Sequence, residues 1–259
     1  MLTANNITYS VGGKRLLDNV SFKLETGKLN FVIGPNGAGK STLIRIISNQ
    51  LRPVGDGAVF YGKLNIRTTP ILEMAKIRSV LSQNIEIAFP ITVAEVVMMG
   101  RYPHFTGKPG KKDQIACEEA MNLFDIADFS GRNYLTLSGG ERQRVHFARV
   151  LAQIWYPPET GCRYLILDEP LTFLDIHYQF DFLHKLIDFM KNNEMVVVGV
   201  VHDLNLAATF GDKILLLDHG KLIVEGRKEE VLTIGNISMV YKMEPKIHHE
   251  NGRMYLFFD

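Results

Sequence analysis

Features that mark specialised classes of protein are scarce in this chain. Its 259 residues include only two cysteines, Cys117 and Cys162, which stand far apart and without the spacing of metal ligands. We therefore expect a reducing, cytosolic compartment. The first residues, MLTANNITYSVGGKR, contain no apolar segment, so we expect no secretory signal peptide.

An excess of one charge and long apolar runs are also lacking. The chain has 29 basic and 28 acidic residues, which leaves a net charge of +1. This balance gives no electrostatic reason to bind nucleic acid or to lie on an anionic membrane. The longest apolar run, residues 196–201 (VVVGVV), is far too short to cross a bilayer. We expect a soluble chain with no nucleic-acid partner, long enough to bury a sizeable core.

Apolar runs alternate with amphipathic segments along the chain. The runs at 28–34, 164–170 and 195–203 end in glycine or polar residues, and the segments at 42–51 and 178–193 have helical periodicity. Strands that are apolar on both faces and separated by helices predict an α/β fold with a mostly parallel sheet. In such sheets ligands bind at the carboxyl ends of the strands, where the polar residues fall here.

Other segments predict smaller structural features. TANNITYSV and LDNVSFKLE near the N-terminus alternate with period two, which predicts antiparallel strands. Residues 212–227 predict a hairpin that turns at 218–220, and the tail after about residue 237 predicts another around 251–252. Residues 84–145 look more helical, which favours an inserted helical subdomain.

The strongest local motif is GPNGAGKST at residues 34–42, which fits G-x-x-x-x-G-K-[ST] between a strand and a helix. Its glycines let successive N–H groups point at phosphate oxygens, and the helix N-terminus adds positive potential. Lys40 supplies charge for the β- and γ-phosphates, and Ser41 offers a hydroxyl to Mg²⁺. A chance glycine turn is the alternative. The predicted nucleotide-binding residues of this loop are Gly34, Pro35, Asn36, Gly37, Ala38, Gly39, Lys40, Ser41 and Thr42.

A second motif, LILDE at residues 165–169, ends a predicted buried strand in two carboxylates. We expect Asp168 to hold Mg²⁺ through water and Glu169 to polarise the attacking water. An acidic turn after a strand is common, so the motif alone does not decide between the two interpretations. The phosphate-binding loop in the same chain favours the functional one.

A third motif, LSGGERQ at residues 137–143, opens a predicted helix. Ser138, Gly139 and Gly140 would form a second anion-binding helix N-terminus. Ser138 and Glu141 also fit a plain capping box, and both interpretations can hold together. A second phosphate-binding helix start suggests that it serves another nucleotide or that of another subunit.

These three motifs, in this order, resemble the ATP-binding subunit of ABC transporters, and the resemblance covers nearly the whole chain. It implies a P-loop NTPase (RecA-like) core and a single domain over 1–259, with a helical subdomain at approximately 84–145 and a short extension at approximately 237–259. It also implies ATP hydrolysis with ATP and Mg²⁺, and Glu169, His202 and Lys40 as catalytic residues. Leu171 and Phe173 depart from the usual family pattern, which affects the expected dimer seam.

The resemblance gives roles to further residues. Tyr9 matches the aromatic residue that stacks on adenine, and Gln83 matches a glutamine that touches Mg²⁺ and the attacking water. Asp175 matches the aspartate across the dimer interface, and His202 matches the histidine at the γ-phosphate. The implied Mg²⁺ ligands are therefore Ser41, Gln83 and Asp168, while the signature residues Ser138, Gly139, Gly140 and Glu141 would face the ATP of the partner subunit. Taken singly, Tyr9 could be packing and His202 a turn residue.

Two segments indicate a branch of the family. GRYPH at residues 100–104 resembles the importers of iron siderophores, heme and cobalamin, although a helix ending at Gly100 explains it equally well in physical terms. The long connection WYPPETGCR at 155–163 resembles the hemin-import ATP-binding proteins. We therefore expect a motor for hemin uptake, with iron-siderophore or cobalamin uptake as the alternative.

The resemblance also implies an assembly. We expect a homodimer in the ATP-bound state, two transmembrane permease subunits and, indirectly, a periplasmic or surface heme-binding protein. The chain would be peripheral on the cytoplasmic face of the inner (plasma) membrane. A soluble ABC ATPase without a membrane partner is the competing class. Such proteins usually carry two fused ATPase domains or basic linkers, whereas this sequence has one phosphate-binding loop, one signature and no charge run.

Overall fold

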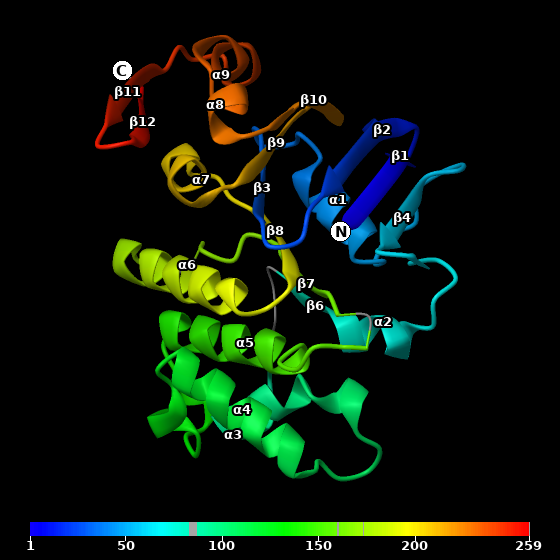
Figure 1. Cartoon of the computed structure of the whole chain (residues 1–259), viewed down its shortest axis with the longest axis vertical. Helices are drawn as coiled ribbons and strands as arrows, with labels where there is room; N and C mark the ends of the chain where they lie inside the picture. The colour runs from blue at the N-terminus through cyan, green and yellow to red at the C-terminus, as the bar shows by residue number, and fades with distance from the viewer. Residues whose placement is uncertain (83–86, 160, 173, 259) are drawn as a thin grey trace. The chain divides into compact units, whose positions relative to one another are not determined.

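The computed structural model describes residues 1–82, 87–159, 161–172 and 174–258 (Figure 1). The chain forms two compact units. The first gathers Met1–Thr68, Leu167–Glu169 and Val196–Asp259, and the second gathers Thr69–Ile166 and Pro170–Met195.

Parallel strands form the centre of the first unit. β3 (Leu29–Ile33) pairs in parallel with both β8 (Met195–Val200) and β9 (Lys213–Asp218). Every residue of β3 and β8 is buried, as expected for parallel strands covered on both faces. β10 (Lys221–Gly226) adds an antiparallel edge through the turn at 218–220, so the predicted hairpin is confirmed.

A second sheet of the first unit is antiparallel, with the order β2-β1-β4-β5. Its strands are β1 (Leu2–Val11), β2 (Lys14–Leu24), β4 (Ala58–Tyr61) and β5 (Leu64–Asn65). The period-two alternation near the N-terminus arises because one face of β1 and β2 is buried, so the prediction of antiparallel strands is confirmed.

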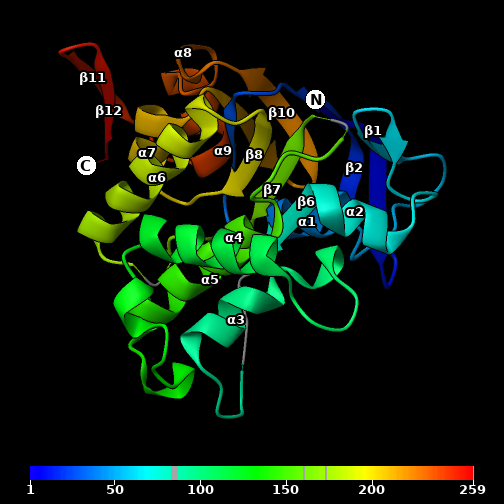
Figure 2. The same ribbon diagram turned by 60° about the horizontal axis from the view of Figure 1, so that its bottom comes forward.

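The remaining elements of the first unit are short. α1 (Lys40–Ile47) follows β3, and the others lie in the C-terminal part of the unit. They are α7 (Leu204–Phe210), α8 (Lys228–Val231), α9 (Ile234–Tyr241), β11 (Lys246–Glu250) and β12 (Arg253–Phe257). The tail closes as the predicted hairpin, and β12 packs on α7 (Figure 2). The side chain of Asn205 makes two hydrogen bonds with the backbone of Leu256, at 2.8 and 3.1 Å.

The second unit is mostly helical. Its helices are α2 (Ile71–Ile77), α3 (Val93–Met99), α4 (Lys111–Leu123), α5 (Gly139–Gln153) and α6 (Ile176–Lys191), with the 3-10 turns η1 (Tyr102–His104), η2 (Ala127–Phe129) and η3 (Tyr134–Thr136) and the neighbouring strands β6 (Arg78–Leu81) and β7 (Arg163–Leu167). α5 packs against both α3 and α4. The rings of Phe147 on α5 and Phe182 on α6 stack with centroids 3.7 Å apart.

The predicted α/β fold class is confirmed by this mostly parallel sheet, the N-terminal antiparallel sheet and the helical region. Within the described part of the chain, no helix has the length and apolar character needed to span a membrane.

Candidate functional site

The glycine-rich loop after β3 adopts a conformation that only glycine permits at two positions. Gly34 has φ +148°, and a Cβ there would lie 2.2 Å from the backbone oxygen of Leu217. Gly39 has φ +102°, and a Cβ there would lie 2.7 Å from the backbone oxygen of Leu16. Larger residues would force the loop away from these neighbours. The sequence therefore holds the loop in a tight curl directly before α1.

Lys40 begins α1 and folds back over the loop. Its Nζ donates hydrogen bonds to the backbone oxygens of Gly34, at 2.8 Å, and Pro35, at 3.0 Å. Burial lowers the pKa of Lys40, while the negative charge of Glu169 acts in the opposite direction. A buried ammonium held over a curl of backbone is suited to binding phosphate oxygens.

Neighbouring strands support the loop. Gly220, in the turn between β9 and β10, donates its N–H to the backbone oxygen of Ala38 at 3.0 Å, and its own oxygen accepts the N–H of Asp18 at 2.8 Å. Tyr9 is half-buried on β1 opposite Leu17 of β2. Cδ2 of Leu17 lies 2.8 Å from the place of a Cβ on Gly39, so the strand pair brings Tyr9 to the same region.

Asp168 follows β7 and is 6% exposed. Its Oδ1 is buried and meets no hydrogen-bond donor among the described residues. Burial and the adjacent charge of Glu169 raise the pKa of Asp168, and Arg45 on α1 opposes this shift. An orphaned, buried carboxylate oxygen is costly unless a cation or donor completes it.

Glu169 and His202 form a pair in the first unit. The distance from Nε2 of His202 to Oε1 of Glu169 is 2.9 Å, and the side chain of Glu169 is 14% exposed. Glu169 also has a φ of 51°, in the left-handed region that a residue with a side chain rarely adopts. Such backbone strain concentrates at functional sites. The pair therefore places a carboxylate and an imidazole where they can act on one water molecule.

The signature segment lies in the second unit, at the start of α5. Oγ of Ser138 accepts the N–H of Glu141 at 3.3 Å, and Oε2 of Glu141 accepts the N–H of Ser138 at 2.7 Å. These two bonds confirm the predicted capping box. They also lower the pKa of Glu141, and Arg132 adds to the effect. Ser138 and Gly139 are exposed, so the start of α5 is open to solvent in this chain.

Asp175 and Gln143 lie in the same unit. Asp175 is exposed and caps α6, since its Oδ1 accepts the N–H of Tyr178 at 3.0 Å. Nε2 of Gln143 donates to the backbone oxygen of Pro170 at 2.7 Å and so ties α5 to the turn after β7. Two positions named from the sequence, Gln83 and Phe173, lie outside the described residues.

The structure divides the predicted site residues between the two units. Tyr9, Lys40, Asp168, Glu169 and His202 lie in the first. The first unit also holds the rest of the glycine-rich loop, whereas Ser138, Gly139, Gly140, Glu141 and Asp175 lie in the second. Arg45 and Gln143 were missed from the sequence. The one clue to Arg45 is its position one turn into the helix after the loop, and the one clue to Gln143 is that it ends the LSGGERQ motif.

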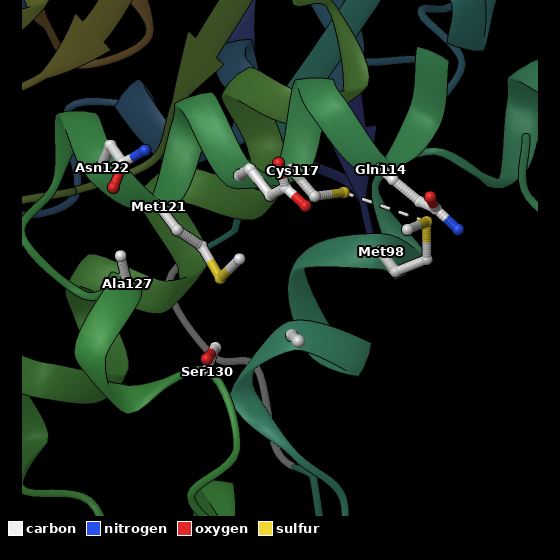
Figure 3. Close-up of a pocket in the computed structure, with 9 residues that line it drawn as sticks. Met98, Gln114, Cys117, Met121, Asn122, Ala127 and Ser130 are labelled. Atoms are coloured by element: carbon white, nitrogen blue, oxygen red, sulfur yellow. Dashed lines mark hydrogen bonds between the residues drawn. The ribbon is translucent and has the colours of Figure 1, made fainter. Parts of the chain in front are cut away.

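A separate pocket of about 520 Å³ lies in the second unit, and its lining includes Met98, Cys117 and Met121 (Figure 3). The thiol of Cys117 lies 3.9 Å from Sδ of Met98. Burial raises the pKa of Cys117 to about 12. The thiol therefore stays protonated at neutral pH, and it offers no reactive nucleophile to this pocket.

Comparisons with known proteins agree with this geometry. The sequence profile of the family described as "ABC transporter" matches residues 17–172. The chain is 41% identical to the Hemin import ATP-binding protein HmuV of Escherichia coli O157:H7, covering 93% of this chain and 92% of the relative. It is 44% identical to the protein of the same name from Gloeobacter violaceus, covering 90% and 84%.

Solved structures share the fold. An ABC transporter assigned to the metal-chelate type, in an inward-facing conformation, superposes with a TM-score of 0.82 at 25% identity, covering 100% of this chain and 96% of the other. An ATP-binding cassette in a dimeric, post-hydrolysis state bound to ADP and phosphate has a TM-score of 0.73 at 25% identity, covering 88% and 99%.

Proposed function

The chain belongs to the ABC transporter family, and from that premise we propose that it is the ATP-hydrolysing subunit of an importer, powering uptake of hemin through a separate membrane permease. The observation that carries the proposal is the set of groups in the first unit: the curled loop with Lys40, the orphaned carboxylate of Asp168, and the Glu169–His202 pair. Together these groups are suited to hold a triphosphate and to activate water beside it.

Glu169 is the proposed general base. Its carboxylate takes a proton from water as the water oxygen attacks the γ-phosphorus, and the bond between that phosphorus and the β–γ bridging oxygen breaks to release ADP. His202, 2.9 Å from Glu169, positions the water and the γ-phosphate. Lys40 stabilises the charge that develops on the phosphate oxygens. Such electrostatic stabilisation, together with positioning, accounts for most of the catalysis in phosphoryl transfer.

Magnesium fits the residues present. The buried Oδ1 of Asp168 has no donor in the described chain, and a hard oxygen of this kind is what Mg²⁺ prefers, directly or through water. Ser41 and, from the sequence, Gln83 would complete the protein's share of the ligands. When bound, Mg²⁺ neutralises part of the phosphate charge during hydrolysis.

The exposed start of α5 supports the proposed assembly of two copies. Ser138, Gly139, Gly140 and Glu141 would bind the ATP of a second copy of the chain, and Asp175 would lie at the seam. Two permease subunits would receive the motion through the helical subdomain at residues 84–145. The chain would act peripherally at the cytoplasmic face of the inner membrane, and a periplasmic or surface heme-binding protein would deliver the cargo. Two relatives named for hemin import, at 41% and 44% identity, support this choice of cargo.

An iron-siderophore or cobalamin complex is the alternative cargo. Because one structural neighbour is an ABC transporter assigned to the metal-chelate type, the experiment compares hemin with these two cargoes. The subunit, with the permease that co-purifies from membranes, is reconstituted into liposomes. We expect hemin-loaded binding protein to stimulate ATP hydrolysis, while a ferric siderophore and cobalamin with their own binding proteins leave it at the basal rate. Stimulation by one of those two alone would replace hemin. Absence of hydrolysis under every condition would reject the motor itself.

A further inference from the structure

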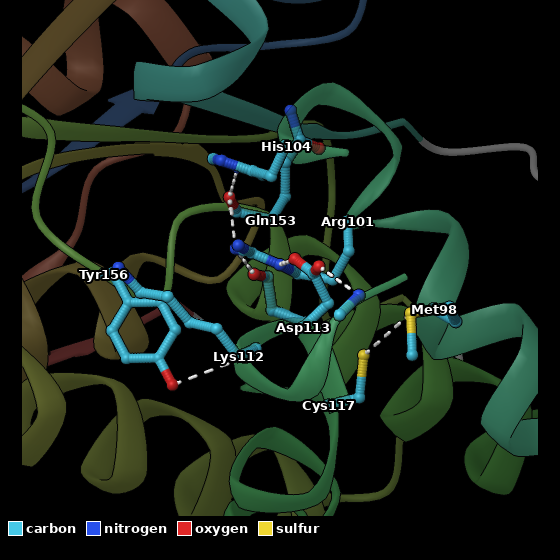
Figure 4. Close-up of polar contacts among 10 residues, drawn as sticks. Met98, Arg101, His104, Lys112, Asp113, Cys117, Gln153 and Tyr156 are labelled. Carbon is cyan, nitrogen blue, oxygen red and sulfur yellow. Dashed lines mark hydrogen bonds and ion pairs between the residues drawn. The ribbon is translucent and has the colours of Figure 1, made fainter. Parts of the chain in front are cut away.

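Two side chains of the GRYPH segment, those of Arg101 and His104, turn inward and contact the C-terminal end of α5 (Figure 4). The guanidinium of Arg101, which is 3% exposed, donates to the backbone oxygens of Ala152, at 2.7 Å, and Gln153, at 3.3 Å. Nε2 of His104 lies 2.6 Å from the same oxygen of Gln153. Helix C-termini leave carbonyl oxygens without intrahelical partners. A cation there, such as the guanidinium of Arg101, also interacts favourably with the negative end of the helix dipole. The segment is therefore a cap on the signature helix.

Arg101 is itself fixed from the opposite side. Its Nε lies 3.0 Å from Oδ1 of Asp113 on α4, and both side chains are more than nine-tenths buried. The other oxygen, Oδ2, accepts the N–H of Gly110 at 3.0 Å and so caps α4. Breaking a buried ion pair by removing one partner leaves an uncompensated charge. Arg101 thus has one defined position, set by α4 on one side and α5 on the other.

Gly100, the first residue of the segment, brings α3 close to α5. A Cβ on Gly100 would lie 2.1 Å from the backbone oxygen of Arg149 on α5. Because its φ is −59°, glycine is needed here for space and not for backbone conformation. The side chain of Tyr102 in the same segment is 59% exposed, unlike that of Arg101, so it takes no part in the buried contact with α5.

Gln153, the last residue of α5, extends the contact to β6. Its Nε2 donates to the backbone oxygens of Ala75, at 2.7 Å, and Arg78, at 2.9 Å. Its Oε1 accepts a hydrogen bond from Oγ of Ser79 at 3.0 Å. In the sequence, β6 leads directly towards Gln83.

The long connection after α5 joins the same cluster. The guanidinium of Arg101 lies 5.7 Å, and Nζ of Lys112 4.6 Å, from the ring centre of Tyr156. Nε1 of Trp155 donates to Oε2 of Glu119 on α4 at 2.6 Å. The two segments that indicated the branch of the family are therefore in contact and form one structural feature.

We propose that Arg101 and Gln153 are positioning residues for ATP hydrolysis: they fix the direction of α5 and, through it, the place of Ser138 and Gly139 at its far end. This proposal rests on the proposed function, in which the signature segment binds the partner's ATP. The 15 residues of α5 make a rod about 22 Å long. A tilt of about 5° at the capped end would move the signature end by about 2 Å, more than a hydrogen bond to phosphate tolerates.

The test uses the full chain with Gln153→Met, which keeps the length of the side chain and removes its three hydrogen bonds. We expect kcat for ATP hydrolysis to fall by about tenfold or more, because the signature end shifts away from the transition state. The affinity for fluorescent ADP should stay within about twofold of wild type, because the phosphate loop lies in the other unit. Arg101→Lys keeps the charge but loses the planar guanidinium that reaches two carbonyl oxygens. We therefore expect the same result, a lower kcat with an unchanged affinity for ADP.

The matched control is Gln114→Met, at an exposed glutamine on α4 that does not belong to the cluster around Arg101 and Gln153. This variant should hydrolyse ATP at the wild-type rate. Ser79→Ala removes a single hydrogen bond to Gln153 and serves if the larger changes do not fold; a smaller fall in kcat at unchanged ADP affinity is expected. Wild-type kcat in the folded variants would overturn the proposal, as would a parallel loss of kcat and ADP affinity. A wild-type protein that hydrolyses no ATP would instead reject the proposed function.

Discussion

Glu169 is the residue on which the proposed chemistry depends most. Glu169→Gln keeps the shape of the side chain and its proximity to His202, 2.9 Å away in the native pair, but an amide cannot accept the proton of water. We expect steady-state hydrolysis to fall by about 10²–10⁴-fold, the usual contribution of a general base, while ATP binding is retained. Phosphate release and a fluorescent-nucleotide titration measure the two effects. Hydrolysis at the wild-type rate would remove Glu169 from the role of base.

His146 gives a second prediction at this scale. It is 4% exposed, and its Nε2 lies 2.7 Å from the hydroxyl oxygen of Tyr134. Burial, with the nearby charges of Arg149 and Arg142, lowers the pKa of His146 to about 3. Unfolded histidine has a pKa of about 6.5, so between these values the unfolded state binds more protons and stability is lost as the pH falls.

The linked loss amounts to about 2 kcal/mol between pH 7 and pH 5. His146→Gln has no group that titrates in this range and can still hydrogen-bond to Tyr134, so its unfolding free energy should depend less on pH. Urea unfolding of both proteins at pH 7 and pH 5 measures the difference. Equal pH dependence in the two proteins would mean that His146 is not the titrating group.

At the scale of elements, the contact of α3 with α5 depends on Gly100. Gly100→Ala places a methyl group 2.1 Å from the backbone oxygen of Arg149, so the two helices must separate. Overpacking of this kind costs about 1–3 kcal/mol, and we expect a clearly lower melting temperature. Gly131→Ala is the control, because no described atom lies within 4 Å of the added Cβ. A melting temperature for Gly100→Ala equal to that control would contradict the contact.

Elements set by local chemistry could be predicted from the sequence. Ser138 and Glu141 of the capping box are only three positions apart, and the hairpin turn at 218–220 is equally local. The inward direction of Arg101 could not be predicted, because its partners Ala152 and Gln153 lie about fifty residues further along the chain. Periodicity shows which face of a helix is buried, but it does not show which helix covers that face.

At the scale of the whole molecule, the order of the motifs along the sequence does not show which motif belongs to which of the two units. Leu167–Glu169 belongs to the unit of the glycine-rich loop, although the chain on either side of it belongs to the other unit. The LILDE motif predicted that Asp168 and Glu169 end a buried strand. The family resemblance named Glu169 and His202 only as separate catalytic residues. Their pairing could not be predicted, because it depends on two strands of different sequence position meeting at one edge.

The same division gives a test of assembly. Gly139 is exposed at the start of α5, and no described atom lies within 4 Å of a Cβ added there. Gly139→Val should therefore fold normally and bind nucleotide through the first unit. If two copies enclose ATP between the loop of one and the signature of the other, the added side chain occupies the place of the partner's phosphates.

We expect Gly139→Val to lose ATP hydrolysis by about 10²-fold or more, because it removes an interaction made to the transition state by the second copy. In a Glu169→Gln background it should also lose the ATP-dependent dimer, measured by sedimentation velocity. Gly235→Val is the matched control, since Gly235 also stands in the first turn of a helix, α9, with no described atom within 4 Å of its added Cβ. Persistence of hydrolysis and of the dimer in Gly139→Val would mean that the signature segment does not face a second copy's nucleotide.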